Sequence, residues 1–172
     1  MHSSHHIMAL VARDLQDSLA DDVLGVPFSQ DRDELVIPLL DRPGALFVSC
    51  SPAVPVVFLH ESFARAKRNS VDLLTRAGGT TVRGIALHPS DRILSLSLSN
   101  GLTLEIQLFG PRSNVMLLDE TRTVVDAFKK SKQLTGTVVP VPDTVRYQAL
   151  PDAARGPFAE GTMMLGASVK RA

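Results

Sequence analysis

Asp91 and Arg92 are the residues of this 172-residue chain whose types and spacing are most suited to binding chemistry. They come directly before Ile93–Leu98, a segment in which leucine and serine alternate. An arginine at the end of a rigid strand offers a planar fork of donors to a phosphate or a guanine edge, and an adjacent carboxylate can orient it. In an ordinary turn, the same pair caps backbone amides and covers the end of a sheet. Spacing alone leaves both interpretations open.

Two other polar groups follow apolar segments and are not explained by packing. Arg112 and Asn114 lie in the loop Phe109–Val115, between two apolar segments. Lys129 and Lys130 come immediately after the last apolar alternation. Because strand interiors are explained by packing, these connecting residues are where we expect a functional surface.

Catalytic and metal-binding patterns are scarce. The sequence has no phosphate-binding glycine loop, no dinucleotide fingerprint and no His-Glu-x-x-His motif. His60 and His88 follow apolar segments without a nucleophile motif, which favours structural or surface histidines. Cys50 is the single cysteine, so we expect a small buried side chain and no intrachain disulfide or multi-thiolate site. We therefore predict no catalytic residue, no metal site, no cofactor and no enzymatic activity.

The balance of charge restricts how nucleic acid could bind. Lysine plus arginine and aspartate plus glutamate both number 18, so any nucleic-acid site must be a local patch. Hydrophobic residues make up 44% of the chain, which is typical of a folded protein. The sequence shows neither an apolar run of membrane-spanning length nor a signal-peptide pattern, and these properties predict a cytoplasmic protein.

The first third of the chain predicts a helix followed by a hairpin. Apolar residues recur at helical spacing from Met8 to Leu19. Glu34–Leu40 and Ala45–Cys50 flank a Pro-Gly turn, as in a β-hairpin. Pro38 cannot donate to a ladder, so we expect its strand at a sheet edge or with a bulge.

The segment after the next predicted strand, Val54–Leu59, has the propensity of a helix. We predict this helix over Glu61–Ala77, ending at Gly78. It would be the most basic helix of the chain, and a solvated face is favoured over a phosphate-binding one.

Two leucine rows fix the hairpin that follows a predicted strand at Thr80–His88. Leucines alternate with polar residues in Ile93–Leu98 and again in Leu102–Leu108. A two-residue Asn100–Gly101 turn would place the two rows on opposite faces of the sheet. A three-residue loop that begins at Ser99 pairs Leu98 with Leu102 and places both rows on one face, so we predict that loop.

A last hairpin, Val115–Leu118 with Thr123–Phe128, completes the predicted elements. Together they indicate an α+β fold: an antiparallel β-sandwich or strongly bent sheet with an N-terminal helix and a second helix. We divide the chain into a core at residues 1–132 and a Pro/Gly-rich extended segment at residues 133–172 that lies over the core or leads to further domains.

Several of these segments, taken in order, resemble the N-terminal domain of the NFACT family. This family is also known as fibronectin-binding protein A and includes RqcH-like ribosome quality control factors. The resemblance implies an N-terminal fold similar to that of formamidopyrimidine-DNA glycosylases. The segments that carry it are Gln30–Val36, Pro89–Leu94, Phe109–Glu120 and Val125–Lys130.

The resemblance also implies a function and a site. Family members bind obstructed large ribosomal subunits and recruit tRNA, in bacteria alanyl-tRNA, to extend the stalled nascent chain. Their Asp-Arg pair, matched here by Asp91 and Arg92, is associated with this tailing step. A basic residue usually follows the loop glycine in the family, whereas here Pro111 takes that position and Arg112 comes next. The expected RNA-binding patch comprises Asp91, Arg92, Arg112, Asn114, Lys129 and Lys130.

Two alternative functions belong to other classes. A glycosylase-like enzyme would need the N-terminal proline and adjacent glutamate of that superfamily, but this chain begins Met1-His2-Ser3. A fibronectin-binding adhesin would match the old family name, although no export signal or disulfide framework supports it. An RNA-binding module is therefore the leading hypothesis.

Overall fold

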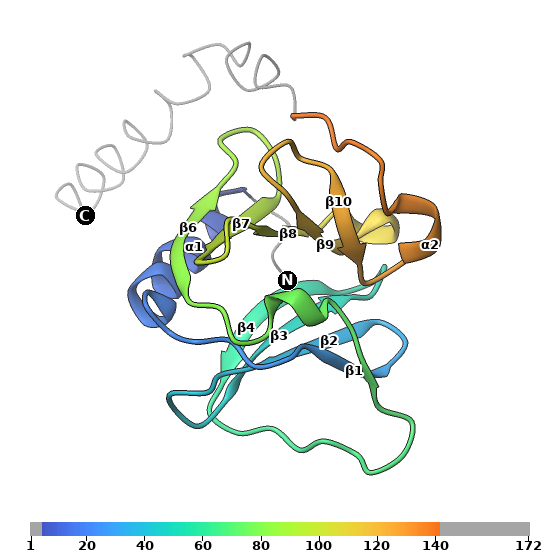
Figure 1. Ribbon diagram of the computed structural model, residues 1–172. Coiled ribbons are helices and arrows are strands. Elements are labelled where there is room, and N and C mark those ends of the chain that lie inside the picture. Colours follow the sequence, from blue (N-terminus) through green and yellow to red (C-terminus); the bar gives the residue numbers. More distant parts are fainter. Residues whose placement is uncertain (1–4, 142–172) are drawn as a thin grey trace, which may run out of the picture.

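Two five-stranded antiparallel sheets face each other in the computed structural model, which describes residues 5–141 (Figure 1). The prediction for residues 133–172 therefore falls mostly outside the described part of the chain. Helix α1 (His5–Leu19) lies beside the two sheets. This arrangement confirms the predicted α+β class with a β-sandwich.

The first sheet has the strand order β4-β3-β2-β1-β5, and the second has the order β10-β9-β8-β7-β6. Each sheet is thus built from one continuous half of the chain. The first sheet comprises β1 (Phe28–Asp31), β2 (Glu34–Pro38), β3 (Ala45–Cys50), β4 (Pro55–His60) and β5 (Val71–Asp72). The second comprises β6 (Val82–Leu87), β7 (Ile93–Leu98), β8 (Thr103–Gln107), β9 (Asn114–Leu118) and β10 (Val124–Ala127). Short helical turns occur at Thr75–Ala77, Gly110–Arg112 and α2 (Ser131–Leu134).

The core lies between the sheets and beneath α1. Met8, Leu15 and Leu19 occur two turns and one turn apart on one face of the helix, and all three are buried in the main apolar cluster. The same cluster contains both predicted leucine rows and the inward-facing residues of β2 and β3. The helical and strand periodicities therefore converge on one core.

The hairpin between β7 and β8 has the predicted three-residue loop. Leu96 pairs with Leu104, and the Leu98 amide donates to the Leu102 carbonyl at 2.9 Å. Gly101 has φ of +81°, a left-handed conformation that a glycine adopts without steric cost. The loop therefore contains one residue more than a two-residue Asn-Gly turn. This extra residue lets both leucine rows face the core.

The predicted helix at Glu61–Ala77 is wrong. Residues 61–70 form an irregular segment, which is followed by β5 and the short turn at Thr75–Ala77. The Gln30 side chain donates to the Ala64 carbonyl and accepts from the Ala66 amide. Contacts between distant residues replace helical hydrogen bonds here, and such contacts routinely override helix propensity.

The edge position predicted for the strand of Pro38 is also wrong, although its ladder with β1 contains the kind of register irregularity named as the alternative. Its strand, β2, lies inside the first sheet between β3 and β1, and the β2–β3 register is continuous. Pro38 is the last residue of β2 and pairs with Ala45 at the end of that ladder. At the end of a strand, as at the edge of a sheet, the missing backbone N–H of proline removes no hydrogen bond from the interior of the ladder.

Lys129 joins the two sheets. Its ammonium group donates to Asp33 Oδ1 at 2.5 Å and to the Cys50 carbonyl at 2.8 Å. Cys50 is buried, as predicted, and burial raises the pKa of its thiol to about 12. Within residues 5–141 no helix is long and apolar enough to cross a bilayer.

Candidate functional site

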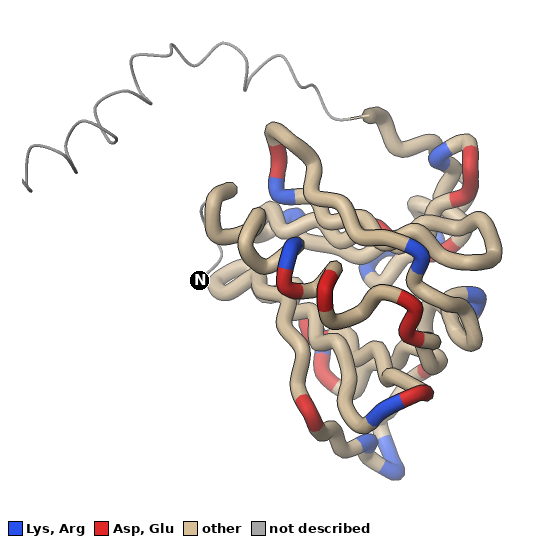
Figure 2. The backbone as a smooth tube through the Cα atoms, turned by 90° about the vertical axis from the view of Figure 1, so that its left-hand side faces the viewer, with Lys and Arg blue, Asp and Glu red and all other residues tan. Residues whose placement is uncertain are grey.

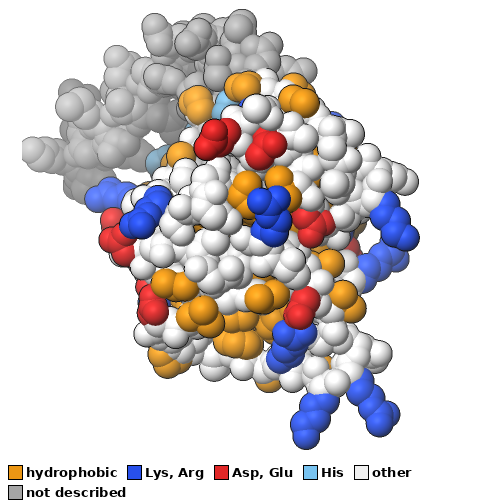
Figure 3. Space-filling view, viewed as in Figure 1, with side chains coloured by type: hydrophobic (Ala, Val, Ile, Leu, Met, Phe, Trp, Pro, Cys, Tyr) orange, Lys and Arg blue, Asp and Glu red, His pale blue; other side chains and the backbone are white. Residues whose placement is uncertain are grey.

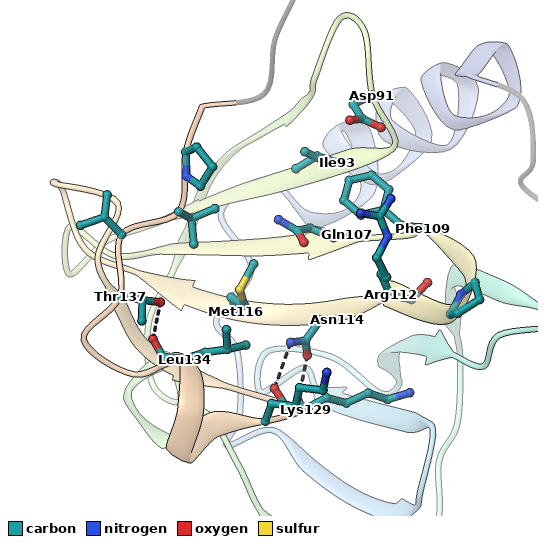
Figure 4. Close-up of a pocket in the computed structure, with 16 residues that line it drawn as sticks. Asp91, Ile93, Gln107, Phe109, Arg112, Asn114, Met116, Lys129, Leu134 and Thr137 are labelled. Carbon is teal, nitrogen blue, oxygen red and sulfur yellow. Dashed lines mark hydrogen bonds between the residues drawn. The ribbon is translucent and has the colours of Figure 1, made fainter.

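Five of the six predicted site residues surround one hollow of about 500 Å³ on the outer face of the second sheet (Figure 4). We call it the polar hollow. Ile93, Gln107 and Asn114 belong to one register row across β7, β8 and β9 and line it. The predicted residues that line the polar hollow are Asp91, Arg112, Asn114, Lys129 and Lys130.

Arg92 does not line the polar hollow, although Asp91 does. The Asp91 Oδ1 atom accepts a hydrogen bond from the Arg92 amide at 2.9 Å. The Arg92 carbonyl accepts from the Leu108 amide at 3.0 Å, which ties the turn to the end of β8. The pair therefore performs the turn role that its sequence allowed, and only its carboxylate borders the hollow.

Arg112 is the exposed cation of the loop between β8 and β9. Its guanidinium carbon lies 5.8 Å from the centre of the Phe109 ring, at the outer limit of a cation–π contact. Gly110, which opens this turn, has φ of +65°, and Pro111 is the second residue of the helical turn. The loop holds Arg112 beside the hollow with its charge accessible to a ligand.

Asn114 is buried and has a structural role. Its Oδ1 atom accepts from the amides of Lys129, at 2.8 Å, and Val115, at 2.9 Å. Its Nδ2 atom donates to the Lys129 carbonyl at 3.0 Å (Figure 4). Asn114 therefore positions Lys129, whose ammonium in turn bonds to Asp33 and Cys50, so both side chains are engaged within the fold.

Lys130 is the second exposed cation at the polar hollow. Its backbone has φ of +58°, which is uncommon for a residue other than glycine. In this conformation its carbonyl accepts hydrogen bonds from the amides of Gln133 and Leu134 and begins α2. The charged groups of the hollow that no described residue engages in an ion pair are thus those of Asp91, Arg112 and Lys130.

A buried ion pair lies beside the hollow. Glu105 on β8 is 1% exposed. Its carboxylate accepts hydrogen bonds from the Arg122 guanidinium at 2.9 Å and from the side-chain amide of Gln107 at 2.8 Å. The Arg122 Nε atom also donates to the Val139 carbonyl. Residues up to Pro140 therefore cover part of this sheet face and line the hollow, in agreement with the expectation that this segment lies over the core.

Ser113 is a site residue that the sequence analysis missed. It lines the polar hollow, it is 2% exposed, and its hydroxyl has no hydrogen-bond partner among the described residues. An unsatisfied buried hydroxyl costs roughly 1–3 kcal/mol. The only sequence signal was its position between Arg112 and Asn114.

Metal binding has no support in residues 5–141, where no cluster of three or more His, Cys, Asp or Glu side chains occurs. His60 and His88 each hydrogen-bond to a serine two residues later, as expected for structural histidines. The polar hollow therefore offers cations, one carboxylate and an aromatic ring. Such groups suit a phosphate or a polar base edge.

Comparisons with known proteins give a fold and no closer relationship. No protein-family model matches the sequence, and no curated protein sequence matches it. The N-terminal domain of fibronectin-binding protein PavA from Streptococcus pneumoniae superposes with a TM-score of 0.69 at 17% identity, over 81% of this chain and 61% of that one.

Two further solved structures superpose in the same way. The N-terminal part of the fibronectin/fibrinogen-binding protein from Streptococcus suis gives a TM-score of 0.63 at 22% identity, over 77% of this chain and 59% of that one. The fibrinogen-binding protein from Staphylococcus aureus gives 0.58 at 18% identity, over 77% and 53%. Our chain thus spans less than two thirds of each solved chain. Its fold is that of the N-terminal domains of these fibronectin- and fibrinogen-binding proteins.

Proposed function

We propose that this chain is a noncatalytic RNA-binding module of a cytoplasmic, ribosome-associated quality control factor. One observation carries the proposal: residues from three separate loops, chosen from the sequence as an RNA-binding patch, line one hollow in the fold. Asp91, Arg112 and Lys130 represent those loops. The partners would be tRNA and the large ribosomal subunit.

The chemistry of the polar hollow supports a nucleic-acid ligand. Arg112 and Lys130 are exposed cations that can contact phosphates, and the Phe109 ring lies beside the arginine. Asp91 can accept hydrogen bonds from base amino groups or ribose hydroxyls. Because the net charge of the chain is zero, these two cations must act locally.

The choice of RNA rests on the resemblance to the NFACT family. The matching Asp-Arg pair is associated there with tRNA-dependent tailing of stalled nascent chains. In this chain the carboxylate of that pair borders the hollow while the Arg92 backbone holds the turn. The pair would therefore act through Asp91 and through the geometry of the turn.

Fibronectin or fibrinogen binding is the second candidate. It is favoured by the names of the three solved structures, each of which is described as binding one or both of these proteins. Sequence identities of 17–22% support a shared fold only, so fibronectin or fibrinogen binding by this chain needs a direct test.

A binding comparison tests the proposal. The full chain and its Arg112→Ala/Lys130→Ala variant are titrated with fluorescent tRNA at several salt concentrations, and both are sedimented with large ribosomal subunits. Loss of two phosphate contacts should weaken tRNA binding on the order of tenfold and lower the salt dependence. Arg76→Ala/Arg83→Ala is the matched control, because it removes two exposed charges that do not line the hollow.

The same assay separates the two candidates. Equal tRNA binding by the wild type and the hollow variant contradicts the site. Binding to immobilised fibronectin without binding to tRNA or to large subunits contradicts the RNA function and supports the second candidate. Asp91→Ala/Arg92→Ala then tests whether the turn contributes beyond the two cations.

A further inference from the structure

The outer face of the first sheet carries a second hollow, far in sequence from the polar hollow. It measures about 490 Å³, and Phe47, Phe58, His60 and Phe63 contribute its rings. We call it the aromatic hollow. Phe58 and Phe63 are 40% and 39% exposed, although large aromatic side chains usually gain stability by burial. Exposed rings gathered in one concave place indicate a binding surface.

The rings of the aromatic hollow have fixed positions on adjacent strands. Phe47 on β3 pairs in register with Phe58 on β4, and their rings stack with centroids 5.3 Å apart and planes 9° apart. His60 meets the Phe47 ring edge-on at 6.0 Å. The two strands therefore present a preformed aromatic surface, which a flat ligand could extend by stacking.

The irregular segment 62–70, which we call the basic segment, borders this surface in a fixed conformation. The Gln30 amide holds its backbone at the Ala64 carbonyl and the Ala66 amide, at 3.1 Å and 2.8 Å. The Arg65 guanidinium lies 4.6 Å from the centre of the Phe28 ring and bonds to Asp72 at 2.7 Å. Phe63 is thereby held at the rim of the aromatic hollow.

The basic segment carries charge that the fold does not use. It contains Arg65, Lys67 and Arg68 and no acidic residue. Lys67 and Arg68 are exposed, and among residues 5–141 neither forms an ion pair. Basic residues occupy the lower tip of the backbone trace, where this segment runs (Figure 2). In the space-filling view they project below exposed hydrophobic side chains (Figure 3).

From this juxtaposition we propose that the aromatic hollow is a stacking site for unpaired bases of single-stranded RNA, with Lys67 and Arg68 contacting the adjacent phosphates. Aromatic faces beside cations are the recurring means of binding single strands, because every base has a face that can stack. The inference rests on the proposed RNA-binding function and extends it to the opposite sheet. It makes the module a two-sided RNA binder, with phosphate and edge contacts at the polar hollow and base stacking at the aromatic hollow.

Binding of short RNAs tests this inference. The full chain is titrated with a fluorescent ten-nucleotide uridine strand and with a blunt RNA duplex. Phe58→Leu keeps an apolar side chain but removes the stacking ring, so affinity for the single strand should fall on the order of tenfold while duplex binding stays unchanged. Lys67→Ala/Arg68→Ala should lower the salt dependence of single-strand binding by about 1.4, from two phosphates at ~0.7 each.

Matched controls make the result decisive. Val71→Ala shortens another exposed side chain of the same sheet, and Arg76→Ala/Arg83→Ala removes two exposed cations elsewhere. Both should bind the single strand like the wild type. Unchanged single-strand binding by Phe58→Leu overturns the stacking site, as does an equal loss for the strand and the duplex.

The alternative occupant of this face is an extended peptide that adds to the open edge strand β4. A ten-residue peptide of alternating valine and threonine is therefore titrated in parallel. If Phe58→Leu weakens peptide binding and leaves RNA binding unchanged, the face is a peptide site and the inference is wrong. If tRNA binding depends on Arg112 but single-strand binding ignores Phe58, the proposed function survives and the stacking site fails. If no RNA binds at all, the proposed function itself fails.

Discussion

The outer faces of the two sheets use their polar residues in opposite ways. On the second sheet, Asn114, Glu105 and Lys129 are engaged in hydrogen bonds that hold strands, turns and the following segment together. On the first sheet, Lys67 and Arg68 project from a segment whose own backbone is held by Gln30. On the second face, ion pairs of Glu105 with Arg122 and of Lys129 with Asp33 stabilise the fold. On the first face, the segment that borders the exposed rings carries Lys67 and Arg68, which form no ion pair within residues 5–141.

This difference shows that a polar cluster must be sorted by its partners before it is given a function. Five of the six residues selected from the sequence line the polar hollow, and these five divide into a structural group and a group available to a ligand. Asn114 and Lys129 belong to the first, whereas Asp91, Arg112 and Lys130 belong to the second. Exposure and hydrogen bonding separate the two groups, and residue type alone does not.

The largest effect should come from breaking the buried ion pair of the second face. Arg122→Ala leaves the Glu105 carboxylate, 1% exposed, without its cation and also frees the Val139 carbonyl. An uncompensated buried charge is strongly destabilising, so we expect the free energy of unfolding to fall by about 3 kcal/mol. Urea denaturation followed by circular dichroism measures the loss.

A double variant without the buried charge and a surface variant serve as controls for that measurement. Glu105→Gln/Arg122→Ala removes the stranded charge and should recover part of the lost stability. Arg83→Ala removes an exposed arginine that lies 3.8 Å from Asp21, and should change the unfolding free energy by less than about 0.5 kcal/mol. If Arg122→Ala is as mild as Arg83→Ala, the second face is not held by this pair.

The second sheet also shows how far sequence reasoning reaches. The pairing of β7 with β8 and the loop at Ser99 were predictable because strand periodicity and turn geometry are local. The specific contact of Arg122 with Val139 in the covering segment could not be predicted, since no local pattern indicates that these two residues bond to each other. The buried position of Glu105 follows from that long-range covering.

The site was predictable to the same degree. Its loops could be found because polar residues at strand ends remain after packing has explained the rest. The sequence could not predict that the Lys129 ammonium bonds to a residue of the first sheet. It also could not predict that the Ser113 hydroxyl has no partner among the described residues. The mistaken helix at Glu61–Ala77 has the same origin, because a glutamine more than thirty residues earlier holds that segment. Local propensity contains no information about such partners.

An intermediate effect should come from the thiol at the junction between the sheets. Burial raises the pKa of Cys50 from 9.0 to about 12, with the Lys129 charge opposing this and Asp33 adding to it. The folded state therefore keeps the proton that the unfolded state loses above pH 9, so stability is complete below pH 9 and declines as pH rises toward 12. We expect a loss of about 1.4 kcal/mol by pH 10 relative to Cys50→Ala, measured from unfolding curves of both proteins. If the stabilities of the wild type and Cys50→Ala changed in parallel with pH, the thiol pKa would be the same in the folded and unfolded states and the prediction would be wrong.

The smallest effect on stability should come from substitutions in the first face. They test directly whether the two outer faces differ in how much their charged residues stabilise the fold. Lys67→Ala/Arg68→Ala deletes two charges, one more than Arg122→Ala, yet these side chains are exposed and unpaired among the described residues. We expect the unfolding free energy to change by less than about 0.5 kcal/mol, because surface substitutions away from buried networks are nearly neutral. Urea denaturation under the conditions used for Arg122→Ala measures it. A loss above about 1 kcal/mol would mean that the basic segment is also architectural, and the two faces would then differ in degree rather than in kind.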